Sequence, residues 1–230
     1  MKSKSPISIK ALEEKRKELW RDSGKILLQV DISFLKLHCS KGKPGYAGAA
    51  RINRYYLHMN NQIIRYCKKR LLPRAIKAYK STAERGEAFR EIRVFAKSHL
   101  TYNENGILSI YTDITENSKY GSITIRFGDV WDLKTGCPVP LSAFFPHTRN
   151  YKKKIKGLII SEVSRLRDRG LGSYFDRIKR NCCKYFSSDN FYLIDDGLVV
   201  FYQMYTIGPK SEGVPSFTLK WSEKGPCKPQ

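Results

Sequence analysis

The adjacent carboxylates Asp195 and Asp196 are the pair of residues in this sequence that most resembles an acid–base site. Two carboxylates can exchange protons with a substrate, or hold a cation, when both side chains reach the same point. Neighbouring residues on a strand point to opposite faces, which prevents that convergence. Aspartate is also a favoured turn residue, and Gly197 follows between two aromatic and β-branched runs. The pattern therefore predicts a hairpin turn and not a catalytic pair.

The histidines and cysteines are the other side chains that could bind a metal ion or attack a substrate. No HxH, HxxxH or CxxC spacing occurs, so a metal site would need distant segments to meet in space. A Cys182 or Cys183 nucleophile lacks a recognisable base, and vicinal cysteines on an expected helix favour reduced thiols over a disulfide framework. The residues concerned are His38, His58, His99, His147, Cys39, Cys67, Cys137, Cys182, Cys183 and Cys227.

Nucleotide-binding and hydrolase motifs are absent from the sequence, which has no Walker A loop, GxSxG elbow or dinucleotide fingerprint. The nearest glycine cluster, at residues 41–48, contains Pro44 and is expected to form a loop. We therefore expect no catalytic residue, no metal site, no cofactor and no enzymatic activity.

Positive charge is the strongest remaining signal. The chain carries 43 Lys and Arg against 21 Asp and Glu, a formal net charge of +22 over 230 residues. The excess is concentrated in segments that read as helices, because residues 51–97 hold 13 basic and 3 acidic side chains, and residues 146–186 hold 12 and 3. Such a surface is either an ordinary solvated face or a binding face for nucleic acid, anionic lipid or an anionic wall polymer.

The candidate anion-binding residues come from these two basic segments. Tyrosines lie among the basic residues of these segments and could stack on bases or complete the core: Tyr66, Tyr79, Tyr151 and Tyr185. Whether the two segments share one face of the molecule is not encoded in the sequence. The ten candidates are Arg65, Lys68, Lys69, Arg70, Lys77, Lys152, Lys153, Lys154, Arg177 and Arg180.

Hydrophobic periodicity predicts the elements of the first half. We expect a short charged helix over residues 10–23, ended by Ser23-Gly24, and then a strand over residues 26–38. A longer helix follows from Arg51, with a kink at Leu71-Leu72-Pro73 and an end near Lys80. Its apolar residues recur at steps of three or four and predict one buried stripe: Ile52, Tyr56, Met59, Ile63 and Cys67.

The second half reads as strands, then helices, then strands again. Alternation predicts strands at residues 92–97, 107–115 and 123–127. Two helices are expected at residues 150–169 and 173–186, with Ser173 as the N-cap of the second. A hairpin is expected next, followed by a last strand at residues 217–221. This order predicts an α+β fold with a mainly antiparallel sheet packed with helices, in two interlocked halves. The expected units are residues 1–49, 50–147 and 148–230.

Two motifs resemble a known family. Residues 191–221 read as a hairpin, a connection punctuated by Gly208-Pro209, and a final strand. Upstream, Asp132-Leu133-Lys134-Thr135-Gly136 forms an Asp-Leu-x-Thr-Gly turn that is followed by Leu141 and a closing Phe145. Together they resemble the RsiV family, which includes the lysozyme-sensing anti-sigma factor RsiV and recurs beside the catalytic domain of the peptidoglycan deacetylase PdaC.

The resemblance implies a non-catalytic recognition module of the cell envelope that binds a protein or a glycan. The deacetylase relatives keep their metal-binding motif in a separate domain, so no deacetylase activity carries over. A net charge of +22 would repel a basic lysozyme, whereas an anionic wall glycan fits it. At the connection, relatives carry Tyr-Glu-Ile where this chain has Tyr205-Thr206-Ile207, and no ligand contact is carried over.

A cytoplasmic nucleic-acid-binding protein is the alternative, since it uses the same basic helices. The sequence has no run of 18 or more apolar residues, so no transmembrane helix is expected. The N-terminus lacks the apolar region of a signal peptide. The chain as written is therefore expected in the cytoplasm, and in the cell envelope if a signal or anchor precedes it.

Overall fold

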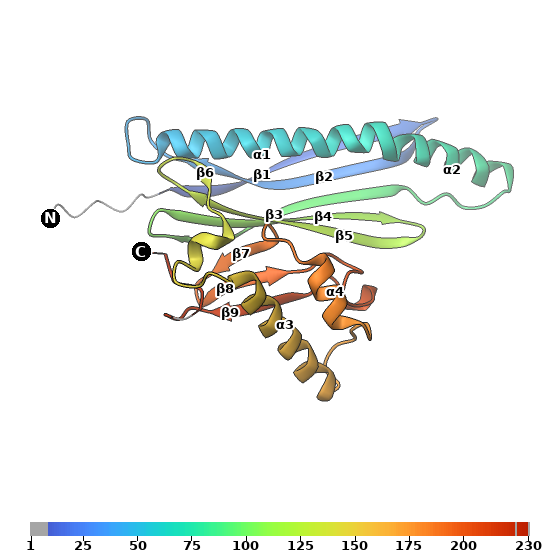
Figure 1. Cartoon of the computed structure of the whole chain (residues 1–230). Helices are drawn as coiled ribbons and strands as arrows, with labels where there is room; N and C mark the ends of the chain where they lie inside the picture. Colours follow the sequence, from blue (N-terminus) through green and yellow to red (C-terminus); the bar gives the residue numbers. More distant parts are fainter. Residues whose placement is uncertain (1–8, 224, 230) are drawn as a thin grey trace.

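The computed structural model describes residues 9–223 and 225–229, and it shows a mixed α+β fold in which two sheets are layered with helices (Figure 1). The helices are α1 (Tyr46–Tyr66), α2 (Leu72–Glu84), α3 (Tyr151–Asp168) and α4 (Ile178–Tyr185). The strands are β1 (Lys10–Asp22), β2 (Lys25–His38), β3 (Ile92–Glu104), β4 (Ile107–Ser118), β5 (Gly121–Asp132), β6 (Cys137–Pro138), β7 (Phe191–Ile194), β8 (Gly197–Phe201) and β9 (Ser216–Lys220).

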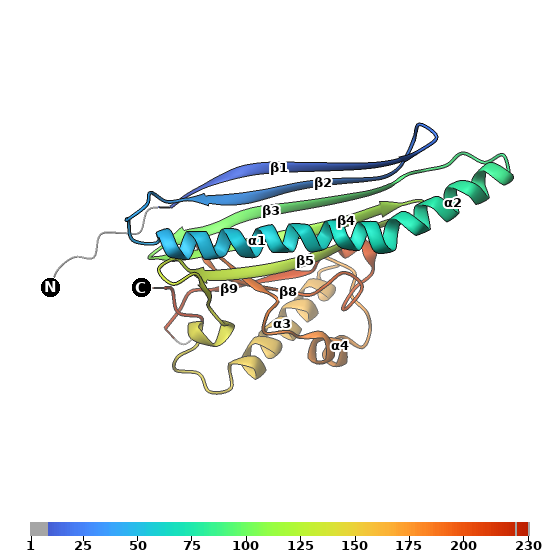
Figure 2. The ribbon, with the colours of Figure 1, turned by 90° about the horizontal axis from the view of Figure 1, so that it is seen from above.

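The larger sheet has six strands in the order β1-β2-β3-β4-β5-β6. All its neighbours are antiparallel except β2 and β3, which are parallel because α1 and α2 form the crossover between them. The two helices cover one face of this sheet (Figures 1 and 2). Ile52 and Tyr56 of α1 pack onto Leu108 and Ile110 of β4, which forms one of the two cores on this face. The prediction of a mainly antiparallel sheet packed with helices is confirmed.

The smaller sheet, β7-β8-β9, packs α3 and α4 on one side and the large sheet on the other. Its edge strand β7 approaches the large sheet closely, and the Leu193 amide donates a hydrogen bond to Ser109 Oγ at 2.9 Å. Gly128 of β5 permits this approach, since a Cβ there would lie 2.0 Å from the Phe191 carbonyl oxygen.

The expected helix over residues 10–23 is wrong, because this segment is strand β1. It pairs antiparallel with β2 over its whole length, and Ser23-Gly24, expected to end a helix, instead makes the hairpin turn with φ of 46° and 81°. The many Lys and Glu residues favour a helix locally. Cross-strand contacts override that preference, as in the ion pair of Lys36 Nζ with Glu14 Oε1 at 2.8 Å.

The long helix and its break agree with the sequence pattern. Ile52, Tyr56, Ile63 and Cys67 are buried and Met59 is partly buried, which confirms the predicted stripe. A π-helical turn, Cys67–Leu71, separates α1 from α2, and Pro73 lies in the first turn of α2. Proline lacks the N–H that a regular helix would use there, so the hydrogen bonding shifts before it. The helix continues to Glu84, beyond the expected end at Lys80.

The C-terminal elements were predicted in kind but not always in extent. Asp195 and Asp196 form the two-residue turn between β7 and β8, with Ile194 opposite Gly197. Helix α4 begins only at Ile178, and Ser173 is not its N-cap. The backbone N–H of Ser173 instead donates a hydrogen bond to Glu212 Oε1 at 2.6 Å. That contact holds the connection after α3 against the loop before β9.

Arg126 of β5 joins the two sheets. Its guanidinium donates two hydrogen bonds of 2.7 Å to the carboxylate of Asp113 on β4, and its side chain is only 14% exposed. The same group lies 4.2 Å from the ring centroid of Tyr111 and 5.9 Å from that of Tyr192, which belongs to the small sheet. Its backbone N–H and C=O bond the side-chain amide of Gln203 at 3.0 and 2.6 Å.

We predict that Arg126→Ala lowers the free energy of unfolding by about 2–4 kcal/mol, since Asp113 would keep a partly buried charge without its partner. Chemical denaturation measures the loss. Arg93→Ala is the matched control, because the Arg93–Glu91 pair leaves its arginine side chain 53% exposed and its removal should cost less than about 1 kcal/mol. Equal losses for the two variants would contradict a special role for Arg126.

Candidate anion-binding pocket

A basic cavity lies beside α2, which continues the long helix. Its volume is about 380 Å³, and its walls come from α2, from the segment that connects α2 to β3, and from the turn between β4 and β5. We name this cavity the α2 pocket. Its charged and hydroxyl-bearing lining residues are Arg74, Lys77, Arg85, Arg90, Lys119, Ser81, Thr82, Ser118 and Tyr120, and its apolar ones are Ala78, Ala88, Phe89 and Ile92.

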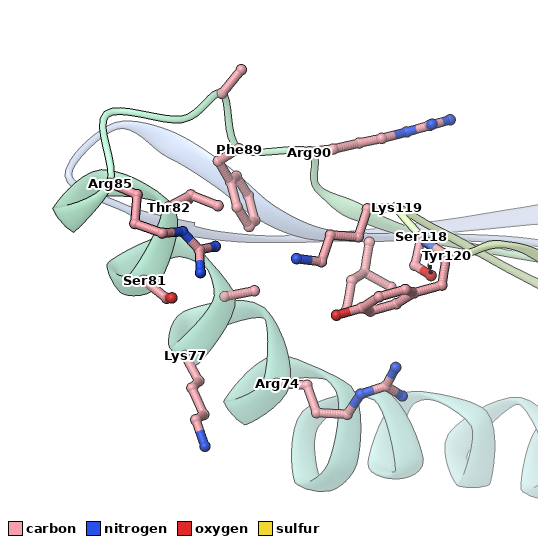
Figure 3. A pocket seen from close by; sticks show the side chains of 13 residues that line it. Arg74, Lys77, Ser81, Thr82, Arg85, Phe89, Arg90, Ser118, Lys119 and Tyr120 are labelled. Atoms are coloured by element: carbon pink, nitrogen blue, oxygen red, sulfur yellow. Dashed lines mark hydrogen bonds between the residues drawn. The ribbon is translucent and has the colours of Figure 1, made fainter.

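The lining side chains approach the cavity from two directions (Figure 3). Lys119 and Tyr120 extend from the β4–β5 turn toward α2, and Arg85 comes from the far wall. Lys77 and Arg90 point away from the cavity and border it on the outside. The ammonium group of Lys119 lies 5.1 Å from the ring centroid of Tyr120, a contact that favours an extended lysine.

Five cationic side chains line or border the α2 pocket, and two of them pair with acidic residues. Arg85 pairs with Glu87 at 3.0 Å, and Arg74 pairs with Glu116 at 3.3 Å. Lys77, Arg90 and Lys119 have no acidic partner among residues 9–223 and 225–229. A concave surface lined by unbalanced charge of one sign focuses its field, so the cavity attracts anions.

A helix-ending motif shapes one wall of the α2 pocket. Gly86 has φ of 65°, and its amide bonds the Ala83 carbonyl at 3.2 Å while the Glu87 amide bonds the Thr82 carbonyl at 2.9 Å. These two bonds are those of a Schellman motif, which needs a left-handed residue at this position. The motif turns the chain back toward β3 and places Arg85 at the rim.

The ten predicted anion-binding residues do not lie on one face. Lys77 lines the α2 pocket, and Arg65, Lys68, Lys69 and Arg70 precede it on α1 and the π-helical turn. The remaining five belong to α3 and the start of α4, on the opposite side of the large sheet (Figure 1). They are Lys152, Lys153, Lys154, Arg177 and Arg180.

Sequence reasoning missed most residues of the α2 pocket. Arg85, Arg90 and Lys119 come from a helix end, a loop and a hairpin turn, and none lies in a long basic run. Two unused signals were present: Gly86 could have marked the helix end, which was expected near Lys80, and the gap between the strands expected at residues 107–115 and 123–127 contains Lys119-Tyr120. Those signals locate the elements, but they do not show that the elements meet.

Asp129 is a second site with unusual chemistry, on the α1 side of β5. The hydroxyls of Tyr55 and Tyr56 donate hydrogen bonds to its carboxylate at 3.2 and 3.0 Å, and Trp131 Nε1 donates to the Tyr56 hydroxyl at 3.2 Å. Burial raises the pKa of the Asp129 carboxyl to about 6, although both tyrosine hydrogen bonds oppose the shift. These hydrogen bonds join α1 to β5, so we interpret the cluster as part of the contact between the two elements.

The thiols and possible metal ligands do not form a further site. All six cysteines are free, and burial raises the pKa of the Cys67 thiol to about 12 and that of Cys182 to about 11. No group of three or more His, Cys, Asp or Glu side chains suited to a metal ion occurs in the described part of the chain. Within that part, no helix has the length and apolar character to cross a membrane.

Comparisons with known proteins relate the chain to one family. Residues 142–222 match the family model described as "Protein of unknown function (DUF3298)". A crystal structure of a DUF3298 family member from Bacteroides fragilis is 16% identical, with a TM-score of 0.60 over 94% of this chain and 90% of that chain. One from Pseudomonas aeruginosa is 14% identical, with a TM-score of 0.56 over 97% and 99%. No curated protein matches the sequence.

We predict that Asp129→Asn changes the pH dependence of stability. The folded-state pKa of about 6 lies above the ordinary value of 3.8. The protonated carboxyl therefore favours the folded state of the wild type at low pH, and this stabilisation is lost as the pH rises through 6. The variant lacks this titration, so its stability relative to wild type should rise by about 1–2 kcal/mol between pH 4 and pH 7.5. Urea denaturation at both pH values measures the difference. A constant difference would contradict the raised pKa.

Proposed function

We propose that this chain, which carries a DUF3298 domain at residues 142–222, is a recognition module that binds an anionic ligand in the α2 pocket without transforming it. One observation carries the proposal: five cationic side chains line or border a cavity of about 380 Å³, and only Arg74 and Arg85 among them have acidic partners. Lys119, which has none, extends from the β4–β5 turn toward α2. Cations and hydroxyls in one cavity form charge-assisted hydrogen bonds with phosphate or carboxylate oxygens.

The size of the α2 pocket limits the ligand group that enters it. A cavity of about 380 Å³ accommodates one sugar or one phosphate ester, and not a folded domain. The resemblance of residues 191–221 to the RsiV family supports a ligand from the cell envelope. We therefore propose a unit of an anionic wall glycan, such as a teichoic acid phosphate or a peptidoglycan carboxylate. The flanking cations of α1 and α2 would attract the rest of the polymer.

We predict that Lys119→Glu weakens binding of a teichoic acid fragment roughly tenfold to a hundredfold, because it replaces a charge-assisted hydrogen bond with repulsion. Isothermal titration calorimetry measures the affinity. Lys119 is exposed at a hairpin turn, so the substitution leaves the core intact.

The matched control is Lys153→Glu, which makes the same charge change on an exposed residue of α3. An equal loss in both variants would show that the ligand responds to net charge and not to the α2 pocket. Tight binding of duplex DNA or RNA, with an affinity that falls steeply with salt and ignores Lys119→Glu, would favour the nucleic-acid alternative instead.

A further inference from the structure

An apolar groove adjoins the α2 pocket. It has a volume of about 580 Å³ and lies between α1 and the strands β4 and β5. We name it the α1–β5 groove. Its apolar lining residues are Met59, Ile63, Tyr66, Leu71, Val94, Ile114, Ile123, Ile125 and Phe127.

The α1–β5 groove exists because the large sheet is wider than the helix layer that covers it. In Figure 2, α1 and α2 run along the sheet and leave part of β5 uncovered. Side chains alternate along a strand, so Ile123, Ile125 and Phe127 all point to the helix side. They are 52%, 48% and 43% exposed, although each is large and apolar. A row of exposed apolar residues of this kind indicates a binding site.

Arg74 connects the groove to the pocket. It lines both cavities, and its guanidinium pairs with Glu116 of β4, which lines the groove, at 3.3 Å. Lys119 and Arg85 then lie on the pocket side, and Ile123 and Ile125 lie on the groove side. A cationic cavity and an apolar groove therefore lie on the two sides of one shared residue, Arg74.

We infer that the anionic ligand is an amphiphile, in which the phosphate of the wall-glycan unit proposed above is esterified with a hydrocarbon chain. Its phosphate occupies the α2 pocket, and its chain lies in the α1–β5 groove. This inference rests on the proposed function, since it gives the anion of the α2 pocket an apolar substituent. Charge complementarity places the phosphate end, and the shared Arg74 sets the direction of the chain.

The edge of β5 argues against an extended peptide as the occupant. A peptide strand would need a run of free backbone groups along this edge. The N–H and C=O of Arg126 already bond the Gln203 side chain, and the Val130 carbonyl accepts a bond from the Val139 amide at 2.7 Å. A hydrocarbon chain needs no backbone partners, so the hydrogen bonds that Arg126 and Val130 already make do not prevent it from binding.

The test measures binding of methyl, butyl, hexyl and octyl phosphate to the full chain by calorimetry. Each added methylene that enters the groove should tighten binding roughly two- to fourfold. Ile125→Ser should weaken octyl phosphate by roughly tenfold and leave methyl phosphate unchanged, since the lost contacts are apolar. Leu12→Ser is the control, because Leu12 is also an exposed strand residue, at 53%, and does not line the groove.

The outcomes separate this inference from the proposed function. If all four alkyl phosphates bound with equal affinity and Lys119→Glu weakened that binding, the inferred hydrocarbon chain would be wrong. The proposal that the α2 pocket binds an anion would then still hold. Octyl trimethylammonium binding as tightly as octyl phosphate would overturn both, and so would the absence of phosphate binding. A dimer in sedimentation equilibrium that Ile125→Ser abolishes would assign the groove to a second copy of the chain and overturn the inference.

Discussion

The ion pair between Arg126 and Asp113 is the contact on which the rest of the structure depends. The two residues face each other across β4 and β5, and the guanidinium lies among rings from both sheets. A charge in this position is stable only with its full set of partners, which are the Asp113 carboxylate and the Ser216 hydroxyl at 3.3 Å. The pair therefore fixes how the small sheet sits on the large one.

The same contact determines which side of β5 is apolar. Because residues alternate, anchoring Arg126 toward the small sheet directs Ile125 and Phe127 toward α1. We call the contact of Arg126 with Tyr111 of the large sheet and Tyr192 of the small sheet the Arg126 joint. A shift of one residue in the register of β5 would bury Ile125 and Phe127 between the two sheets and expose the arginine. Gln203 adds to this constraint, since it binds both backbone groups of Arg126 and holds the strand edge. The α1–β5 groove is thus a consequence of the Arg126 joint, which lies on the opposite face of the large sheet.

Local patterns predicted the elements better than they predicted the site. The stripe from Ile52 to Cys67 and the break before Pro73 follow from helix geometry alone, and both are present. The segment at residues 10–22 has helix-favouring composition, and only its pairing with β2 makes it a strand. The α2 pocket was not predictable for a related reason. Arg85 and Lys119 meet there only because a helix end and a hairpin turn come together in three dimensions.

The family match and the proposed binding surfaces lie in different parts of the chain. The matched residues, 142–222, form α3, α4 and the small sheet, whereas the α2 pocket and the α1–β5 groove fall between residues 59 and 127. The solved relatives share the fold across nearly the whole chain at low identity, so the scaffold persists while side chains change. A binding site on the unmatched half can therefore differ between relatives without disturbing the Arg126 joint. The scaffold therefore places no constraint of its own on the exposed residues of the proposed binding surfaces.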